Sequence, residues 1–358
     1  MPPEPIAWDL AERVAARVGG REPLAESYHV DSLERDFAEL TSEAEALVAE
    51  ETGLVSAAGP ARARVTDRRG WVRANLRSFR RLLKPLTERL GGKMSSNAAA
   101  AGVTRTLTGI EVGTLLGWMS TRVLGQYDLL LVEDEDPADQ DLVYYVGPNV
   151  LALEKKFAFP PREFRLWLAL HEVTHRAQFT GIPWLRDHFL GLVDATLGSV
   201  DPDPKRLLAA LRRALDETRA GRNPLDEGGL VALLATPEQQ DALGRIGGMM
   251  SLLEGHGDVT MSRAAGDRIP SAERFHRVLH QRRSNATGPA KVLQKVVGLD
   301  AKLKQYEQGE KFITAVEAYG GPELLRRAWA GPEYLPSLPE VREPLRWIER
   351  VEATPVGS

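Results

Sequence analysis

The segment that most constrains this chain is Leu166–Phe179, which reads LWLALHEVTHRAQF. Its apolar residues cover most of the circumference of a helix, and this is typical of a helix buried in a core. Two histidines, His171 and His175, and the carboxylate of Glu172 stand in the same segment. Because burying such groups without partners is costly, the fold has to provide them with a cation or with hydrogen bonds.

The spacing of the two histidines predicts a metal site. Residues four apart lie on one face of a helix, so His171 and His175 can direct one nitrogen each to a common point. Imidazole is a frequent ligand of zinc. Glu172 is turned by about 100° from His171, where it can reach a water on the metal and act as general base. The alternative is a pair of core histidines bonded to carbonyl groups, with Glu172 at the surface.

The third zinc ligand has to come from another part of the sequence, because a site that keeps one position for water needs three protein donors. A histidine six residues after His175 would complete one known pattern, but Gly181 occupies that position. Glu254 is favoured instead, because it falls within an apolar helical stripe where a buried carboxylate needs a cation. His256 and His188 are the alternatives.

Residues close to Glu254 are predicted to support the site. Asp258 follows one helical turn later, where it can accept the distal N–H of a ligating histidine. His256 leaves a regular helix on the opposite side from Glu254, although a kink at Gly255 and Gly257 would turn it inward. With Glu254 as the ligand, His256 can instead donate to the tetrahedral intermediate.

A tyrosine further along the chain is another candidate donor. Tyr306 belongs to a stretch in which Leu303, Phe312 and Val316 form an expected buried helix face. A core position explains Tyr306 most simply, and donation to an oxyanion beside the metal is the alternative role.

Patterning along the chain predicts a mainly helical α+β protein with a small antiparallel β element before the motif helix. Tyr127–Val132 and Leu142–Val146 are short β-favouring runs, and we expect them to pair as a hairpin. The motif helix is predicted from about Arg162 to about Phe179. We expect a single domain over residues 1–358, with an N-terminal lobe over 1–180 and a helical C-terminal lobe over 181–358.

An apolar stretch in the N-terminal part has glycines at regular spacing. Gly109, Gly113 and Gly117 recur every four residues, which predicts that another element approaches this helix face closely. Glu111 and Arg122 interrupt the stretch, so we do not expect it to span a membrane.

Composition excludes several kinds of site and partner. The 358 residues contain no cysteine, which excludes disulfides, thiolate nucleophiles and cysteine-bound zinc. The net charge of −4 is small and argues against a nucleic-acid or membrane partner. The N-terminal residues lack the basic and apolar regions of a signal peptide, so we expect a cytoplasmic protein. The expected partner is a peptide or small amide substrate, and the oligomeric state is left open.

Five stretches of the sequence, taken in order, resemble one bacterial family. They are VLGQYDLLL, HEVTHRAQFTGIPWLRDH, LLEGHGDVTM, GLDAKLKQYEQGEKFITAV and YLPSLPEVREPLRWIERV. The family is that of the zincin-like metallopeptidases, which are labelled hydrolases and are in some members associated with biosynthesis of a deazaflavin coenzyme. The resemblance implies a zincin-type site at His171, Glu172 and His175, and no particular substrate. Glu254 followed by Asp258 after the H-E-x-x-H motif is also similar to the gluzincin arrangement.

The sequence therefore predicts a zinc-dependent hydrolase, foremost a metallopeptidase in which Glu172 activates the attacking water. One alternative is a metal-binding but catalytically idle protein that serves interaction or regulation, and another is a small-molecule amide hydrolase. The presence of Glu172 favours an enzyme, since a purely structural zinc site does not need it. A peptide substrate would require an accessible strand edge, which Leu142–Val146 is expected to supply.

Overall fold

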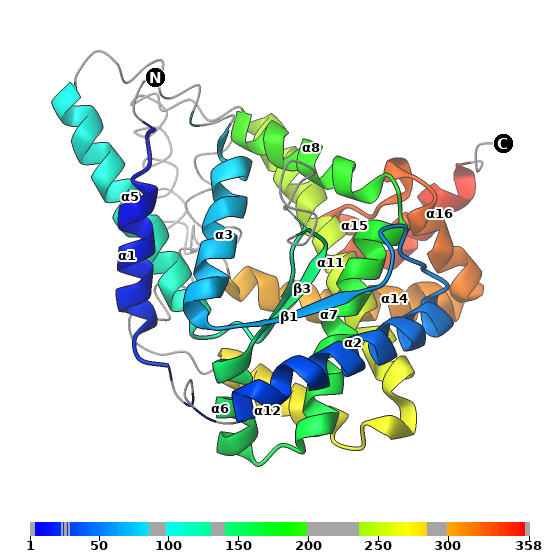
Figure 1. The fold of residues 1–358 in the computed structure, drawn as a ribbon. Helices are drawn as coiled ribbons and strands as arrows, with labels where there is room; N and C mark the ends of the chain where they lie inside the picture. Colours follow the sequence, from blue (N-terminus) through cyan, green and yellow to red (C-terminus); the bar gives the residue numbers. More distant parts are fainter. Residues whose placement is uncertain are drawn as a thin grey trace. The chain divides into compact units, whose positions relative to one another are not determined.

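Figure 1 shows the fold of the chain in a computed structural model. The structure describes residues 4–22, 24, 27, 29–84, 87, 98–129, 140–198, 236–284 and 299–354. The chain forms two compact units, of which the first comprises Met1–Gly181 and Thr260–Val278 and the second Ile182–Val259 and Leu279–Ser358. The organisation as one domain with two lobes stays a prediction.

The first unit combines helices with one small sheet. Its elements are α1 Trp8–Gly19, α2 His29–Thr52, β1 Arg62–Thr66, α3 Arg68–Leu82, α5 Ala98–Ser120, β2 Gly125–Tyr127, β3 Leu142–Val146, α6 Gly147–Phe157, α7 Pro161–Gly181, the last residues of α11, η2 Gly266–Arg268 and the first half of α12 Ala272–Ser284. The predicted class, mainly helical α+β, is confirmed. None of the described helices is long and apolar enough to cross a membrane.

The sheet has three strands in the order β1-β3-β2. Strand β3 pairs in parallel with β1, from Arg62 opposite Leu142 to Thr66 opposite Val146. On its other side β3 pairs antiparallel with β2. All residues of β3 are buried, so this central strand belongs to the core.

The sheet corrects two expectations from the sequence. Leu142–Val146 forms a strand as predicted, but both of its edges are paired, so it cannot be the open edge expected for a peptide. The other predicted strand, Tyr127–Val132, overlaps the observed strand β2 only at Tyr127, because β2 runs from Gly125 to Tyr127 and pairs antiparallel with β3. Residues 130–132 of that prediction lie outside the described part of the chain. Strand β1 was not predicted, because arginines interrupt the short RARVT run and its partner lies far along the sequence.

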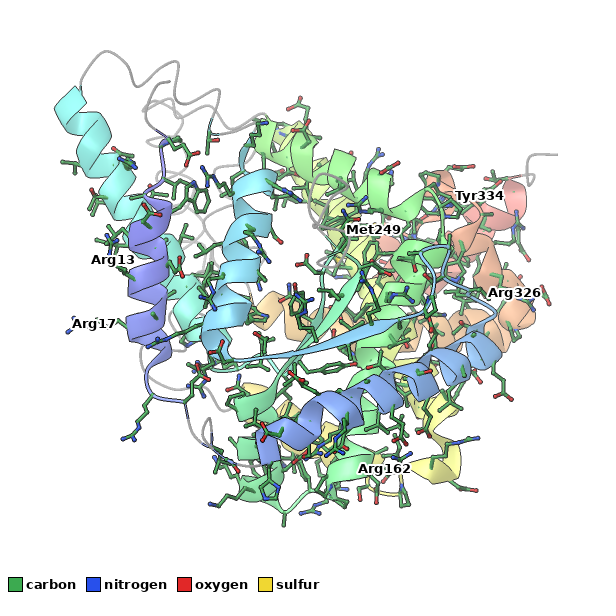
Figure 2. All side chains as sticks on the ribbon, viewed as in Figure 1. Arg13, Arg17, Arg162, Met249, Arg326 and Tyr334 are labelled. Atoms are coloured by element: carbon green, nitrogen blue, oxygen red, sulfur yellow. The ribbon has the colours of Figure 1, made fainter. Side chains whose placement is uncertain are left out.

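Helix α7 carries the H-E-x-x-H motif and matches its predicted bounds within two residues. Helix α2 packs along it. Arg162, at the start of α7, donates to Glu39 and Glu43 of α2 at 2.9 Å each (Figure 2). The buried Arg165 donates through two nitrogens to Glu154 of α6, at 2.8 Å each. The buried bonds of Arg165 hold the motif helix against α6, whereas the ion pairs of Arg162 with α2 lie at the surface and contribute little.

Helices α1 and α5 lie side by side in Figure 1, in the way that the glycine spacing predicts. A Cβ atom added at Gly113 would lie 2.4 Å from the carbonyl oxygen of Ala11, and one at Gly117 would lie 2.6 Å from that of Ala15. Gly109 meets the N-terminal end of α1 in the same manner. Only glycine fits at such distances, so the predicted close approach is confirmed.

The second unit contains two long helices and a set of short C-terminal ones. Its elements are α8 Leu185–Gly198, α11 Pro237–Ala265 up to Val259, the second half of α12, α14 Leu299–Arg326, η3 Arg327–Trp329, η4 Pro332–Tyr334, α15 Leu338–Arg342 and α16 Pro344–Ala353. The short helices pack on α14 around a core that includes Phe312, Val316, Tyr334 and Trp347. Phe312 and Val316 are therefore buried, as the sequence predicts.

Helices α11 and α14 touch backbone to backbone. A Cβ atom added at Gly255 would lie 2.3 Å from the carbonyl carbon of Gly309, and one at Gly309 would lie 1.9 Å from the carbonyl oxygen of Ser251. Gly255 thus permits a close contact and does not loosen the helix. Helix α11 is continuous, so the kink that would turn His256 inward does not occur.

Candidate metal centre

Two histidines of α7 form the first part of the candidate site. The ring centroids of His171 and His175 lie 4.7 Å apart, and the ring planes meet at 86°. Both side chains are half-buried and lie one helical turn apart. The helical spacing read from the sequence therefore brings the two imidazoles together.

Glu254 of α11 completes a group of three possible ligands. His171, His175 and Glu254 each offer one ligand atom, and these atoms lie within 4.8 Å of one another. Glu254 is only 5% exposed, and a buried carboxylate is best compensated by a cation. Two imidazole nitrogens and one carboxylate oxygen are a donor set that zinc accepts while it keeps a position for water. The residues present therefore fit a zinc ion.

Glu172, the predicted base, is buried beside strand β2. The backbone N–H of Tyr127 donates to Oε2 of Glu172 at 3.1 Å. The charge of Glu172 also acts on Tyr145 of the neighbouring strand β3. Burial raises the pKa of Tyr145, the hydrogen bond to Thr41 lowers it, and the negative charge of Glu172 raises it further. The bond from Tyr127 holds one oxygen of the base in a fixed orientation.

Gly125 leaves room for this carboxylate, and no pattern in the sequence indicated that role. A Cβ atom added at position 125 would lie 2.7 Å from both Cγ and Oε1 of Glu172. For the zinc hydrolase that the sequence predicts, we expect Gly125→Ala to displace the carboxylate and to lower the rate of hydrolysis by about 100-fold, which a 1 Å misplacement can cost, while zinc content stays unchanged. Rate measurements and elemental analysis test both parts. Gly191→Ala is the control, because a Cβ atom there meets nothing within 4 Å; equal rates in the two variants would contradict the role.

Gln178 is a residue of the site that sequence analysis missed. It is fully buried, and its Oε1 lies 3.0 Å from Nδ1 of His175. Residues three apart on a helix are neighbours, so both side chains belong to one side of α7. The available signal was an amide side chain in an apolar helix, three residues after a candidate ligand.

Neither alternative third ligand joins the group of three. His256 is buried, and its ring packs edge-on against Trp329 with 5.2 Å between centroids. His188 is half-buried; burial lowers its pKa, and the charge of Arg245 lowers it further. Among the described residues, Glu254 is the one that groups with the two motif histidines.

Two more predicted residues are placed but not tested. Asp258 is half-buried on α11, one turn after Glu254. Tyr306 lies within α14, in a part whose side chains are outside the described residues. The roles given to Asp258, His256 and Tyr306 therefore stay predictions.

A cavity of about 240 Å³ lies beside the opposite face of α7, where it is lined by Val173, Arg176 and Ala177. At about 100° per residue, these three positions lie far around the helix from the histidines. Arg176 donates to Asp141 and Glu45, each at a shortest distance of 2.6 Å. Burial alone would lower the pKa of Arg176, but these two carboxylates outweigh it and raise the pKa. The cavity is thus separate from the candidate metal centre.

A buried H-E-x-x-H helix next to a small mixed sheet defines a zincin-like protein, and comparison with known proteins agrees. The family model of the zincin-like metallopeptidases matches residues 6–348, and the chain therefore belongs to this family. It is also similar to a solved structure from Chloroflexus aurantiacus described as "a putative hydrolase with a novel fold". The TM-score is 0.72 and the identity 30%, over 98% of this chain and 100% of that one. No curated protein matches this chain.

Proposed function

We propose that this chain is a zinc-dependent hydrolase that cleaves amide bonds, foremost in peptides. The observation that carries the proposal is the grouping of His171, His175 and Glu254 within 4.8 Å. The position of Glu172, one residue after the first of these ligands and fixed by a strand, supports a catalytic site. Membership of the zincin-like metallopeptidase family supports the same class of reaction.

The proposed reaction needs a base, an electrophile and a proton path to the leaving nitrogen. A zinc ion in this site would lower the pKa of its water towards neutrality and polarise the substrate carbonyl. Glu172 accepts the proton of the attacking water and passes it to the leaving nitrogen. The N–H of Tyr127 orients this carboxylate through Oε2. In this proposal Asp258 orients a histidine, and His256 and Tyr306 are candidate donors to the developing oxyanion.

The sheet favours an extended substrate. Strand β3 is closed to a substrate because both of its edges are paired, whereas β2 is an outer strand of the described sheet. The backbone N–H of Tyr127 in β2 already donates to Glu172, so a peptide that pairs with the other outward groups of β2 would run past the base. Cleavage of a peptide library would support an extended substrate. Cleavage of single blocked amides alone would favour a small-molecule hydrolase, and zinc binding without any cleavage would favour an idle binding protein.

The Glu254→Gln variant tests the third ligand. Glutamine keeps the size of the side chain and removes the charge that pairs with the ion. Loss of a hydrogen bond to a ligand lowers metal affinity by roughly 10–100-fold, and we expect loss of the ligand charge itself to lower zinc affinity by more than that. Competition with a chromophoric chelator measures the affinity. Asp241→Asn, an exposed change on the same helix, is the control and should bind zinc as the parent does. Full affinity in Glu254→Gln would exclude this residue as a ligand.

A further inference from the structure

A contact between Gln178 and His175 within α7 determines which nitrogen of the His175 ring carries the hydrogen. Oε1 of Gln178 lies 3.0 Å from Nδ1 of His175, and Gln178 is 0% exposed. An amide oxygen has no hydrogen to donate, so in this contact Nδ1 carries the hydrogen and Oε1 accepts it. If the amide were turned round, its NH₂ group would donate to Nδ1 and the hydrogen would move to the other ring nitrogen.

The position of that hydrogen decides whether His175 can bind a metal from its outer nitrogen. A neutral imidazole has one N–H and one lone pair, and only the nitrogen with the lone pair is a ligand. With the hydrogen on Nδ1, the lone pair is on Nε2. The opposite tautomer would present an N–H at Nε2.

We propose that Gln178 is a positioning residue that selects the Nδ1–H tautomer of His175 and fixes the orientation of its ring. The selection is a property of the metal-free chain, and only its consequence for zinc affinity rests on the proposed function. The arrangement parallels the outer hydrogen bonds that generally hold ligating histidines, here supplied one turn away on the same helix as the ligand.

The choice of an amide over a carboxylate follows from burial and charge. A neutral amide costs less to bury than a carboxylate, and position 178 is fully buried. Glu254 and Glu172 already bring two negative charges, which balance the two positive charges of a zinc ion. Gln178 therefore orients His175 without adding a third negative charge to the site.

The first test is the tautomer of His175 in the metal-free parent. The chain carries seven histidines, so ¹⁵N-labelled histidine with assignment by His175→Gln gives a tractable NMR spectrum. At about pH 8, where ordinary imidazoles are neutral, we expect His175 to appear as the Nδ1–H form. In Gln178→Met, which has a similar size and no amide oxygen, we expect a mixture of both tautomers. A parent in the Nε2–H form would overturn the proposal, whatever its zinc affinity.

The second test is zinc affinity in matched variants. Gln178→Met should bind zinc about 10–100-fold more weakly than the parent, and Gln178→Glu, which retains an acceptor, should restore affinity to within a few-fold. Gln239→Met is the control, because Gln239 is also buried and bonded, to Thr196 and Thr236, but lies elsewhere. Parent affinity in Gln178→Met overturns the inference. A parent that binds no zinc overturns the proposed function and leaves the tautomer result to decide the inference.

Discussion

The Glu172→Gln variant is expected to retain one equivalent of zinc and to lose about 10²–10⁴-fold in hydrolysis, the usual contribution of a general base. Glutamine keeps the shape of the side chain, and its amide oxygen can still accept the N–H of Tyr127. It cannot accept a proton at neutral pH, so the attacking water is not activated. Because Glu172 is not one of the three grouped ligand residues, the ion should stay in place. Hydrolysis of a peptide library and elemental analysis of the same samples measure both effects.

Glu34→Gln is the matched control for this experiment. It makes the same chemical change at an exposed position of α2 and should leave both rate and zinc content at the parent level. Parent-level hydrolysis by Glu172→Gln would rule out its role as base. Loss of zinc from the same variant would place Glu172 among the ligands instead.

The Gly309→Ala variant is expected to lose more than about 3 kcal/mol in the free energy of unfolding. The added Cβ atom would lie 1.9 Å from the carbonyl oxygen of Ser251 and 3.0 Å from Cα of Gly255. Overpacking against movable side chains costs about 1–3 kcal/mol. Here the obstacle is the backbone of another helix, so α11 and α14 have to separate. Urea unfolding followed by circular dichroism measures the change.

Gly244→Ala is the control for the glycine contact. It lies on α11, where an added Cβ atom meets nothing within 4 Å, so alanine should stabilise the helix by up to about 1 kcal/mol. The two substitutions are chemically identical and are expected to act in opposite directions. A Gly309→Ala variant with the stability of the parent would show that the two backbones do not touch.

The parts of this fold that could be predicted from the sequence depend on short spacings. The motif helix, the paired imidazoles of His171 and His175, and the glycine face of α5 each follow from residues three or four apart. The burial of Phe312 and Val316 follows from the same periodicity. Such patterns are local, so one sequence is enough to recognise them.

The parts that could not be predicted depend on partners far along the chain. Strand β1 is recognisable only from its pairing with β3. From the sequence alone Gly255 is expected to weaken its helix, and only the contact with Gly309 shows that it permits close packing of two helices. Gly125 has no local signature at all, because its importance comes from the volume that the side chain of Glu172 occupies. In each case tertiary packing assigns the role, and residue type alone leaves it open.

Metal binding and the orientation of Glu172 depend on different parts of the molecule. The candidate ligands come from α7 and α11, whereas the base takes its orientation from β2. Gly125→Ala is thus expected to lower the proposed hydrolysis and to leave the candidate ligands in place. If the proposed function holds, one substitution at this glycine separates loss of hydrolysis from loss of metal, with no ligand replaced.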